Sequence, residues 1–221
     1  MKSASLAKAS ALIGVVIAFG WPLLVAATGI STHRITSVHD DTVVVWNEWL
    51  VVAILCVFAF AIQRRRPSEF GIRRMGWRDV LAGLGAAIVG FVLTGVATRV
   101  VVFPSSLTDP QKLAAVPLGL RVAVVLTAAL CEEFIYRGFG IEELAFLTGK
   151  RWLAGLISLV LFTFSHAGLY GLSLALIVPG ILGAVLTVLY LWRNNLFSCA
   201  IMHAIIDGIM ILIIPAVIHT R

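Results

Sequence analysis

Charged side chains are scarce in this sequence. Of its 221 residues, 13% are Asp, Glu, Lys or Arg and 60% are hydrophobic, and the mean hydropathy is +1.03. A soluble globular domain usually carries about 25% charged residues. The scarcity therefore excludes a water-soluble domain and indicates an integral membrane protein. The short segments of alternating hydrophobicity that mark a membrane β-barrel are also lacking.

Cysteine is rare as well. The three cysteines, Cys56, Cys131 and Cys199, all lie inside apolar runs, and no CxxC pair occurs. This pattern excludes a disulfide framework, and the thiols are interpreted as small hydrophobic side chains. Internal repeats and low-complexity tracts are missing too, which fits a single domain over residues 1–221.

Long apolar runs are what the sequence does contain, and several approach the roughly 20 residues that a helix needs to cross a bilayer. They predict an all-α, polytopic transmembrane helical bundle with about seven spanning helices. The expected helices cover residues 10–28, 44–62, 79–103, 118–136, 151–168, 171–192 and 195–217. Residues 138–149 predict either a short interfacial helix or a continuation of the fourth span.

The seventeen basic residues predict the orientation of the chain. With the amino terminus in the cytoplasm, twelve of them fall inside and five outside. Cytoplasmic loops carry the excess of Lys and Arg, so we predict a cytoplasmic amino terminus in the cell (inner) membrane. The net charge of +6 largely reflects this asymmetry and requires no nucleic-acid partner. The basic cluster at 64–78 either contacts anionic membrane lipids or only sets the topology. The first run, Ala11 to Thr28, is predicted to be an uncleaved span rather than a signal peptide.

Ionisable residues inside apolar runs are the strongest functional signal, because they are costly in a membrane and mark functional sites. Glu132 and Glu133 follow the uncharged run 122–130, and Arg137 comes four residues after Glu133. Residues four apart share a helix face, which predicts an ion pair between Glu133 and Arg137 and points Glu132 in another direction. A buried carboxylate of this kind suits a general base. The alternative is an interfacial ion pair with a snorkelling arginine.

Two further apolar segments contain ionisable residues. His166 ends one of them, as either an interfacial cap or a catalytic group. His203 and Asp207 lie one turn apart on one face of another, as either a helix–helix hydrogen bond or a catalytic pair. At about 1.5 Å per residue, His203 lies about 13 Å from Asn194 and His166 about 22 Å from Arg151. These depths allow the three segments to meet near the middle of the membrane.

In this order, the three motifs resemble those of the CAAX-protease and bacteriocin-processing (CPBP, Abi-type) family of intramembrane endopeptidases. They are Glu132-Glu133-Phe134-Ile135-Tyr136-Arg137, Phe162 to His166, and His203 to Asp207. The resemblance covers about residues 118–210. It implies a helical-bundle hydrolase whose active site lies within the membrane and opens toward the cytoplasm. Its substrates would be membrane-associated peptides or lipidated protein tails.

The resemblance also implies a role for each site residue. Glu132 would activate water, His166 would orient it, His203 with Asp207 would stabilise the oxyanion, and Glu133 with Arg137 would hold the geometry. Many family members have Asn at the position of Asp207. Because an ionised carboxylate cannot donate a hydrogen bond, Asp207 is either protonated or, as we favour, orients His203 as in a catalytic triad.

Other chemistries remain open. Glu132, His166 and His203 would also make a ligand set for a catalytic zinc. Since the usual HExxH spacing is missing, we favour hydrolysis without a metal or other cofactor and keep zinc as the alternative. Two alternative functions are a non-catalytic immunity or scaffold protein of the same fold, and a proton- or cation-coupled transporter. The inverted repeats typical of transporters are not visible.

One acidic residue is given no role in the site. Glu48 lies beside Trp46, Asn47 and Trp49, and tryptophan is enriched where membrane meets water. These residues are predicted to form an interfacial belt on the outer side.

Overall fold

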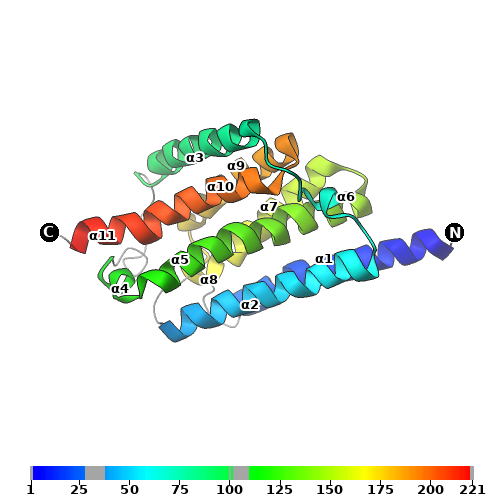
Figure 1. Ribbon diagram of the computed structural model, residues 1–221, viewed down its shortest axis with the longest axis horizontal. Helices are drawn as coiled ribbons and strands as arrows, with labels where there is room; N and C mark the ends of the chain where they lie inside the picture. Colours follow the sequence, from blue (N-terminus) through cyan, green and yellow to red (C-terminus); the bar gives the residue numbers. More distant parts are fainter. Residues whose placement is uncertain (1, 28–37, 100, 102–109, 220–221) are drawn as a thin grey trace.

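The computed structural model describes residues 2–27, 38–99, 101 and 110–219, and its regular elements are all helices (Figure 1). The long helices lie side by side, and the two termini are at opposite ends of the bundle (Figure 1). In chain order, the long helices of the first half are α1 (Lys2–Ala27), α2 (Val38–Cys56) with η1 (Val57–Ile62), and α3 (Trp77–Ala97). Those of the second half are α5 (Leu118–Thr127) with η4 (Ala128–Ile141) and α6 (Glu142–Thr148), α7 (Arg151–Ser165), α9 (Ile177–Arg193), and α10 (Leu196–Gly208) with η6 (Ile209–Ile213) and α11 (Ile214–His219). Short helices connect them: η2 (Pro67–Phe70), α4 (Pro110–Ala115), α8 (Ala167–Tyr170) and η5 (Leu174–Leu176).

Six of the described helices are long and apolar enough to cross a membrane, which confirms the predicted polytopic all-α fold. They are Ser5–Leu23, Asp41–Ile62, Trp77–Ala97, Arg151–Tyr170, Leu174–Arg193 and Leu196–Val217. The predicted span at 118–136 is helical but is not among the six, and it is the segment that contains Glu132, Glu133 and Arg137. It continues without a break through α6, so residues 142–148 extend the fourth predicted helix rather than form a separate interfacial one.

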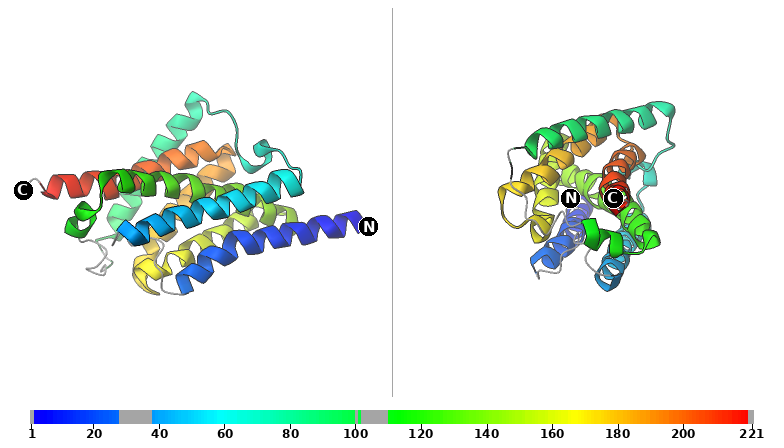
Figure 2. Two further views of the ribbon diagram at one scale, coloured as in Figure 1. Left: turned by 60° about the horizontal axis from the view of Figure 1, so that its bottom comes forward. Right: turned by 90° about the vertical axis from the view of Figure 1, so that its left-hand side faces the viewer.

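The helix that carries Glu132 and Glu133 lies inside the bundle. It contacts α1, α2, α7 and α10, whereas α3 packs along one side of the bundle, on α9 and α10 (Figure 2). Of the residues of η4, only Leu130 keeps substantial exposure, at 40%. The charged residues of this helix therefore face protein on all sides and not lipid.

The loop between α2 and α3 folds back into the bundle and holds η4 in place. Phe70 is fully buried, and its ring stacks on the ring of Phe139 with 5.5 Å between centroids. The next residue, Gly71, has a φ of +74° that a side chain would strain, and its carbonyl accepts a hydrogen bond from Leu196 N at 2.9 Å. A Cβ at Gly71 would also lie 2.7 Å from the ring of Tyr190. The loop thus joins the ends of η4, α9 and α10.

Ion pairs and hydrogen bonds stabilise the basic end of the bundle, where the amino terminus also lies (Figure 1). Gln63 and Arg65 both donate to the buried carboxylate of Glu143, and Arg193 donates to Asp79 at 2.8 Å. The gathering of basic loops at this end agrees with the charge asymmetry of the sequence. The side of the membrane on which it lies stays a prediction.

The same loop contains a carboxylate, Glu69, whose pKa is lowered by its surroundings. The backbone N–H of Arg66 donates to Glu69 at 2.8 Å, and this hydrogen bond, together with the Arg65 guanidinium, holds the pKa of Glu69 below its ordinary value.

Candidate active site

The helix at the centre of the site is wider than the sequence predicts. Residues Ala128–Ile141 form a π-helix of 14 residues, in which each N–H bonds to the carbonyl five residues earlier. π-helical segments are usually single turns and occur often at functional sites. Here the segment includes all three charged residues of the first motif, so the local geometry around Glu132, Glu133 and Arg137 differs from that of the predicted α-helix.

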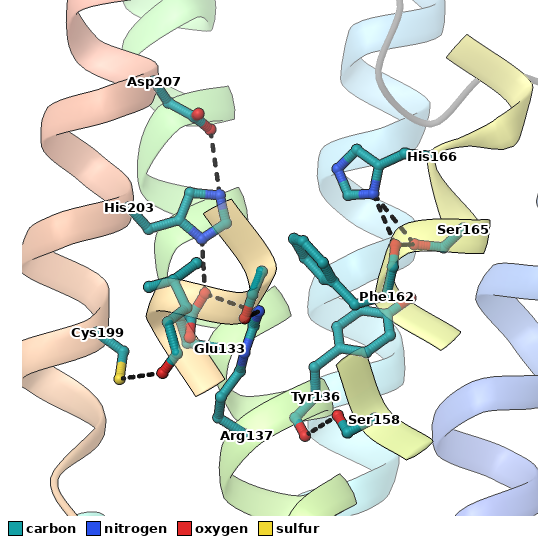
Figure 3. A network of polar contacts seen from close by, with 12 residues as sticks. Glu133, Tyr136, Arg137, Ser158, Phe162, Ser165, His166, Cys199, His203 and Asp207 are labelled. Atoms are coloured by element: carbon teal, nitrogen blue, oxygen red, sulfur yellow. Dashed lines mark hydrogen bonds and ion pairs between the residues drawn. The ribbon is translucent and has the colours of Figure 1, made fainter. Parts of the chain in front are cut away.

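Glu133 lies at the centre of a buried polar network (Figure 3). Its Oε1 accepts a hydrogen bond from Arg137 Nη1 at 3.0 Å and lies 2.7 Å from His203 Nδ1. The side chains of Glu133 and Arg137 are 1% and 0% exposed. The ion pair predicted from the four-residue spacing is therefore confirmed. The contact between Glu133 and His203, which joins η4 to α10, was not predicted.

Arg137 is held by three kinds of contact. Besides its ion pair with Glu133, Nη2 donates to the carbonyl of Gly183 on α9 at 3.2 Å. The guanidinium lies 4.2 Å above the centre of the Phe162 ring on α7. A fully buried cation is costly unless it is paired and hydrogen-bonded, and these contacts supply that compensation from three helices.

His203 lies between two carboxylates. Nδ1 faces Glu133, and Nε2 lies 3.4 Å from Asp207 Oδ2. The second distance fits an ion pair but is long for a hydrogen bond. A carboxylate only accepts, so a ring that donates to both partners carries two protons.

His166 is on the other side of Phe162 from this network (Figure 3). Its Nδ1 lies 2.9 Å from the carbonyl oxygen of Phe162, and the two ring centroids are 4.6 Å apart. Because a carbonyl oxygen only accepts, Nδ1 carries a hydrogen, and Nε2 would be the acceptor if the ring is neutral. The Phe162 ring therefore connects His166 to Arg137, a link that the motif spacing alone did not reveal.

Glu132 is 4% exposed and interacts electrostatically with residues of its own helix and of α2. The partner on α2 is Glu48, which also lies within electrostatic range of His203 and Asp207. The prediction that Glu48 belongs to an outer interfacial belt is therefore wrong, although its neighbour Trp46 is 72% exposed on the outside of the bundle. The signal that could have found Glu48 is its position on the apolar face of α2.

The residues proposed as zinc ligands are not gathered into one cluster among the described residues. In the part of the chain that the structure describes, no three His, Cys, Asp or Glu side chains are arranged to hold a metal ion. Both ring nitrogens of His203 face carboxylates, and Nδ1 of His166 faces a carbonyl. A zinc ion held by Glu132, His166 and His203 would require His203 to turn away from one of its two carboxylates, and hydrolysis without a metal stays a prediction.

The close approach of α9 to α7 at Gly183 allows the packing around Arg137 to be tested by substitution. A Cβ at Gly183 would lie 2.7 Å from Phe162 Cδ1 and 2.9 Å from Leu159 Cδ1. Gly183→Ala should therefore displace the Phe162 ring and the carbonyl that binds Arg137, and lower the free energy of unfolding by about 1–3 kcal/mol. Thermal unfolding in detergent measures the change.

Gly180→Ala is the matched control on the same face of α9. Its Cβ would lie no closer than 3.6 Å to Thr163, an ordinary contact. Equal stability of the Gly183 and Gly180 variants would contradict the tight packing.

These features define a class of protein: a polytopic helical membrane protein with a network of ionisable side chains inside its bundle. Residues 114–209 match the family described as Type II CAAX prenyl endopeptidase Rce1-like. The match contains the six predicted site residues, namely Glu132, Glu133, Arg137, His166, His203 and Asp207. This confirms the resemblance: residues 114–209, somewhat less than half of the chain, are similar to the Rce1-like CAAX prenyl endopeptidases. No curated protein and no solved structure matches the chain.

Proposed function

We propose that the protein is an intramembrane endopeptidase that hydrolyses peptide bonds of membrane-associated or lipidated, CAAX-like substrates. The observation that carries the proposal is the buried network of Glu133, Arg137 and His203, with the partly exposed Asp207 at its edge. It lies beside Glu132 and within the segment that matches a prenyl endopeptidase family. Buried charges of this kind in a membrane protein are costly and mark a functional site.

Glu132 is the general base of this proposal. It takes a proton from a water molecule as the water oxygen adds to the carbonyl carbon of the scissile bond. His166, with Nε2 as the acceptor nitrogen of a neutral ring, orients that water. When the C–N bond breaks, the proton on Glu132 passes to the leaving nitrogen, so that the site returns to its starting state.

His203 stabilises the oxyanion of the tetrahedral intermediate. Glu133 holds Nδ1 at 2.7 Å, while Asp207 lies 3.4 Å from Nε2. Because the contact with Asp207 is long, the proton on Nε2 remains available to the oxyanion. A positive donor fixed in place stabilises this negative charge most strongly inside a water-excluded site. Glu133 then orients the imidazole more directly than Asp207 does, and Arg137 fixes Glu133.

The depth of the site suits a lipidated substrate. His203 is eight residues into the bundle from Asn195 at the basic end, or about 12 Å at about 1.5 Å per residue. A prenyl group that remains among the acyl chains would hold a peptide tail at this depth. We propose that the basic end faces the cytoplasm and that the substrate enters from that side.

Cleavage in proteoliposomes tests this function. The purified protein should release a carboxyl-terminal peptide from a farnesylated CAAX peptide, and should cleave the same peptide more slowly without the farnesyl group. Since we favour hydrolysis without a metal, cleavage should persist in the presence of a zinc chelator. Mass spectrometry of the products measures both effects.

Two results would overturn the proposal. Proton or cation flux without proteolysis would support the transporter, and the absence of both activities would support the immunity or scaffold protein. Loss of cleavage with the chelator, restored by added zinc, would contradict the metal-free mechanism only.

A further inference from the structure

The protein-facing side of α2 contains an acidic residue that lies outside the family match. Val44, Val51 and Leu55 are 9%, 4% and 0% exposed, and their spacing defines the apolar stripe of an amphipathic helix. Glu48 lies on the same stripe, four residues after Val44 and three before Val51. Its side chain is thus directed into the bundle.

Two hydrogen bonds fix α2 against the helix that carries the site. Trp49 Nε1 donates to Thr127 Oγ1 at 3.0 Å, between residues 78 positions apart. Gln63 Nε2 donates to Glu143 Oε2 at 3.2 Å, between residues 80 positions apart. Because the two offsets are nearly equal, the helices run parallel in an almost constant register along this length.

That register places Glu48 at nearly the same level of the bundle as a second carboxylate, that of Glu132. Glu48 lies level with residues 126–128, which is about one helical turn from Glu132. Its Oε2 is inaccessible to solvent and makes no hydrogen bond with the described residues. The groups that act on it electrostatically are Glu132, His203 and Asp207. Glu48 therefore faces the same site from a fourth helix.

We propose that Glu48 is a positioning residue that shares one proton with Glu132, an inference that rests on the proposed function. Two neighbouring carboxylates in a low-dielectric site do not readily ionise together, and they titrate as a pair. In the resting site the pair holds one proton, on Glu48, and Glu132 is ionised. Glu132 is then ready to act as the base.

Sharing a proton with Glu48 speeds the transfer of a proton from Glu132 to the leaving nitrogen. Glu132 gains a proton from water, which leaves the pair with two protons. A doubly protonated pair releases its first proton more readily than an isolated buried carboxyl does. That proton goes to the leaving nitrogen as the C–N bond breaks, and the pair again holds one. Glu48 thus acts through Glu132 and need not touch the substrate.

Steady-state kinetics of two Glu48 variants test the inference in proteoliposomes with the farnesylated peptide. Glu48→Gln keeps the size of the side chain but cannot exchange a proton, so kcat should fall about 10-fold or more while KM stays unchanged. Glu48→Asp keeps the carboxyl group and should retain more activity than Glu48→Gln. A purely structural role predicts the reverse order, because Gln is isosteric with Glu and Asp is shorter.

Trp49→Phe is the matched control on the same helix. It removes the hydrogen bond to Thr127 and should lower thermal stability without the loss of kcat seen for Glu48→Gln. Wild-type kcat in Glu48→Gln, or an Asp variant less active than the Gln variant, would overturn the inference while the endopeptidase function stands.

A second measurement needs no cleavage. Infrared difference spectra recorded between acid and neutral pH detect protonated carboxyl groups. If the proton is shared, Glu48→Gln and Glu132→Gln should each alter the same carboxyl band. If Glu48→Gln leaves this carboxyl band unchanged, Glu48 and Glu132 do not share a proton. This result would hold whether or not the protein is a peptidase.

Discussion

Glu132→Gln is expected to lower kcat for cleavage of the farnesylated peptide by about 10²–10⁴-fold, the usual contribution of a general base. The amide keeps the size of the side chain but cannot accept a proton from water. Because Glu132 takes no part in the contacts of Arg137 with Glu133, Gly183 and Phe162, the bundle should stay folded. Steady-state kinetics together with a thermal unfolding curve separate the two effects.

Glu142→Gln is the control for this experiment, since it makes the same chemical change ten residues further along the same continuous helix. Glu142 accepts hydrogen bonds from Arg151 and Tyr190 at the basic end of the bundle, away from the network. It should keep the kcat of the wild type. Normal cleavage by Glu132→Gln would refute the assignment of the base.

The largest loss of stability is expected for Arg137→Met. Arg137 is fully buried, and its removal leaves Glu133 between one imidazole and apolar surroundings. Removing one partner of a buried ion pair costs about 3–5 kcal/mol, which for a chain of this length lowers the thermal midpoint by roughly 10 °C. Thermal unfolding in detergent measures the shift, and cleavage should be lost with it.

Arg151→Met provides the contrast, because Arg151 forms an ion pair of similar length, 2.6 Å, while its side chain is 41% exposed. An exposed ion pair contributes about 1 kcal/mol or less, so the midpoint should hardly move. The double variant Glu133→Gln/Arg137→Met removes both buried charges and should recover part of the stability of Arg137→Met, without activity. Equal midpoints for the two single arginine variants would refute the burial argument.

Much of the site could be predicted because its residues are conspicuous in an apolar sequence. Glu132, Glu133, Arg137, His166 and His203 stand out by their cost in a membrane. The pairing of Glu133 with Arg137 follows from spacing along one helix, and the structure confirms it. Contacts of this kind depend on local geometry alone.

Contacts between helices could not be predicted in the same way. The approach of His203 to Glu133 depends on how α10 rotates against η4, and the position of Phe162 between His166 and Arg137 depends on how α7 packs. The π-helix itself leaves no clear mark on the hydrophobic pattern of a segment that is buried on nearly all sides.

Glu48 shows why an interpretation from neighbours can mislead. Trp46 and Trp49 beside it suggested an interfacial belt, and Trp46 is indeed on the outside. Residues adjacent on a helix point in different directions; the face of Glu48 is set by Val44, Val51 and Leu55 instead.

The sequence by itself determined that the chain is a membrane-embedded helical protein, and which side chains are costly enough there to be candidates for a functional site. Hydrophobicity and helical spacing are properties of single segments, so they can be read along the chain. Only the tertiary structure decided which carboxylate meets which imidazole and that α2 contributes Glu48. Those choices depend on the rotation and register of packed helices, and many weak contacts from distant parts of the chain set them together.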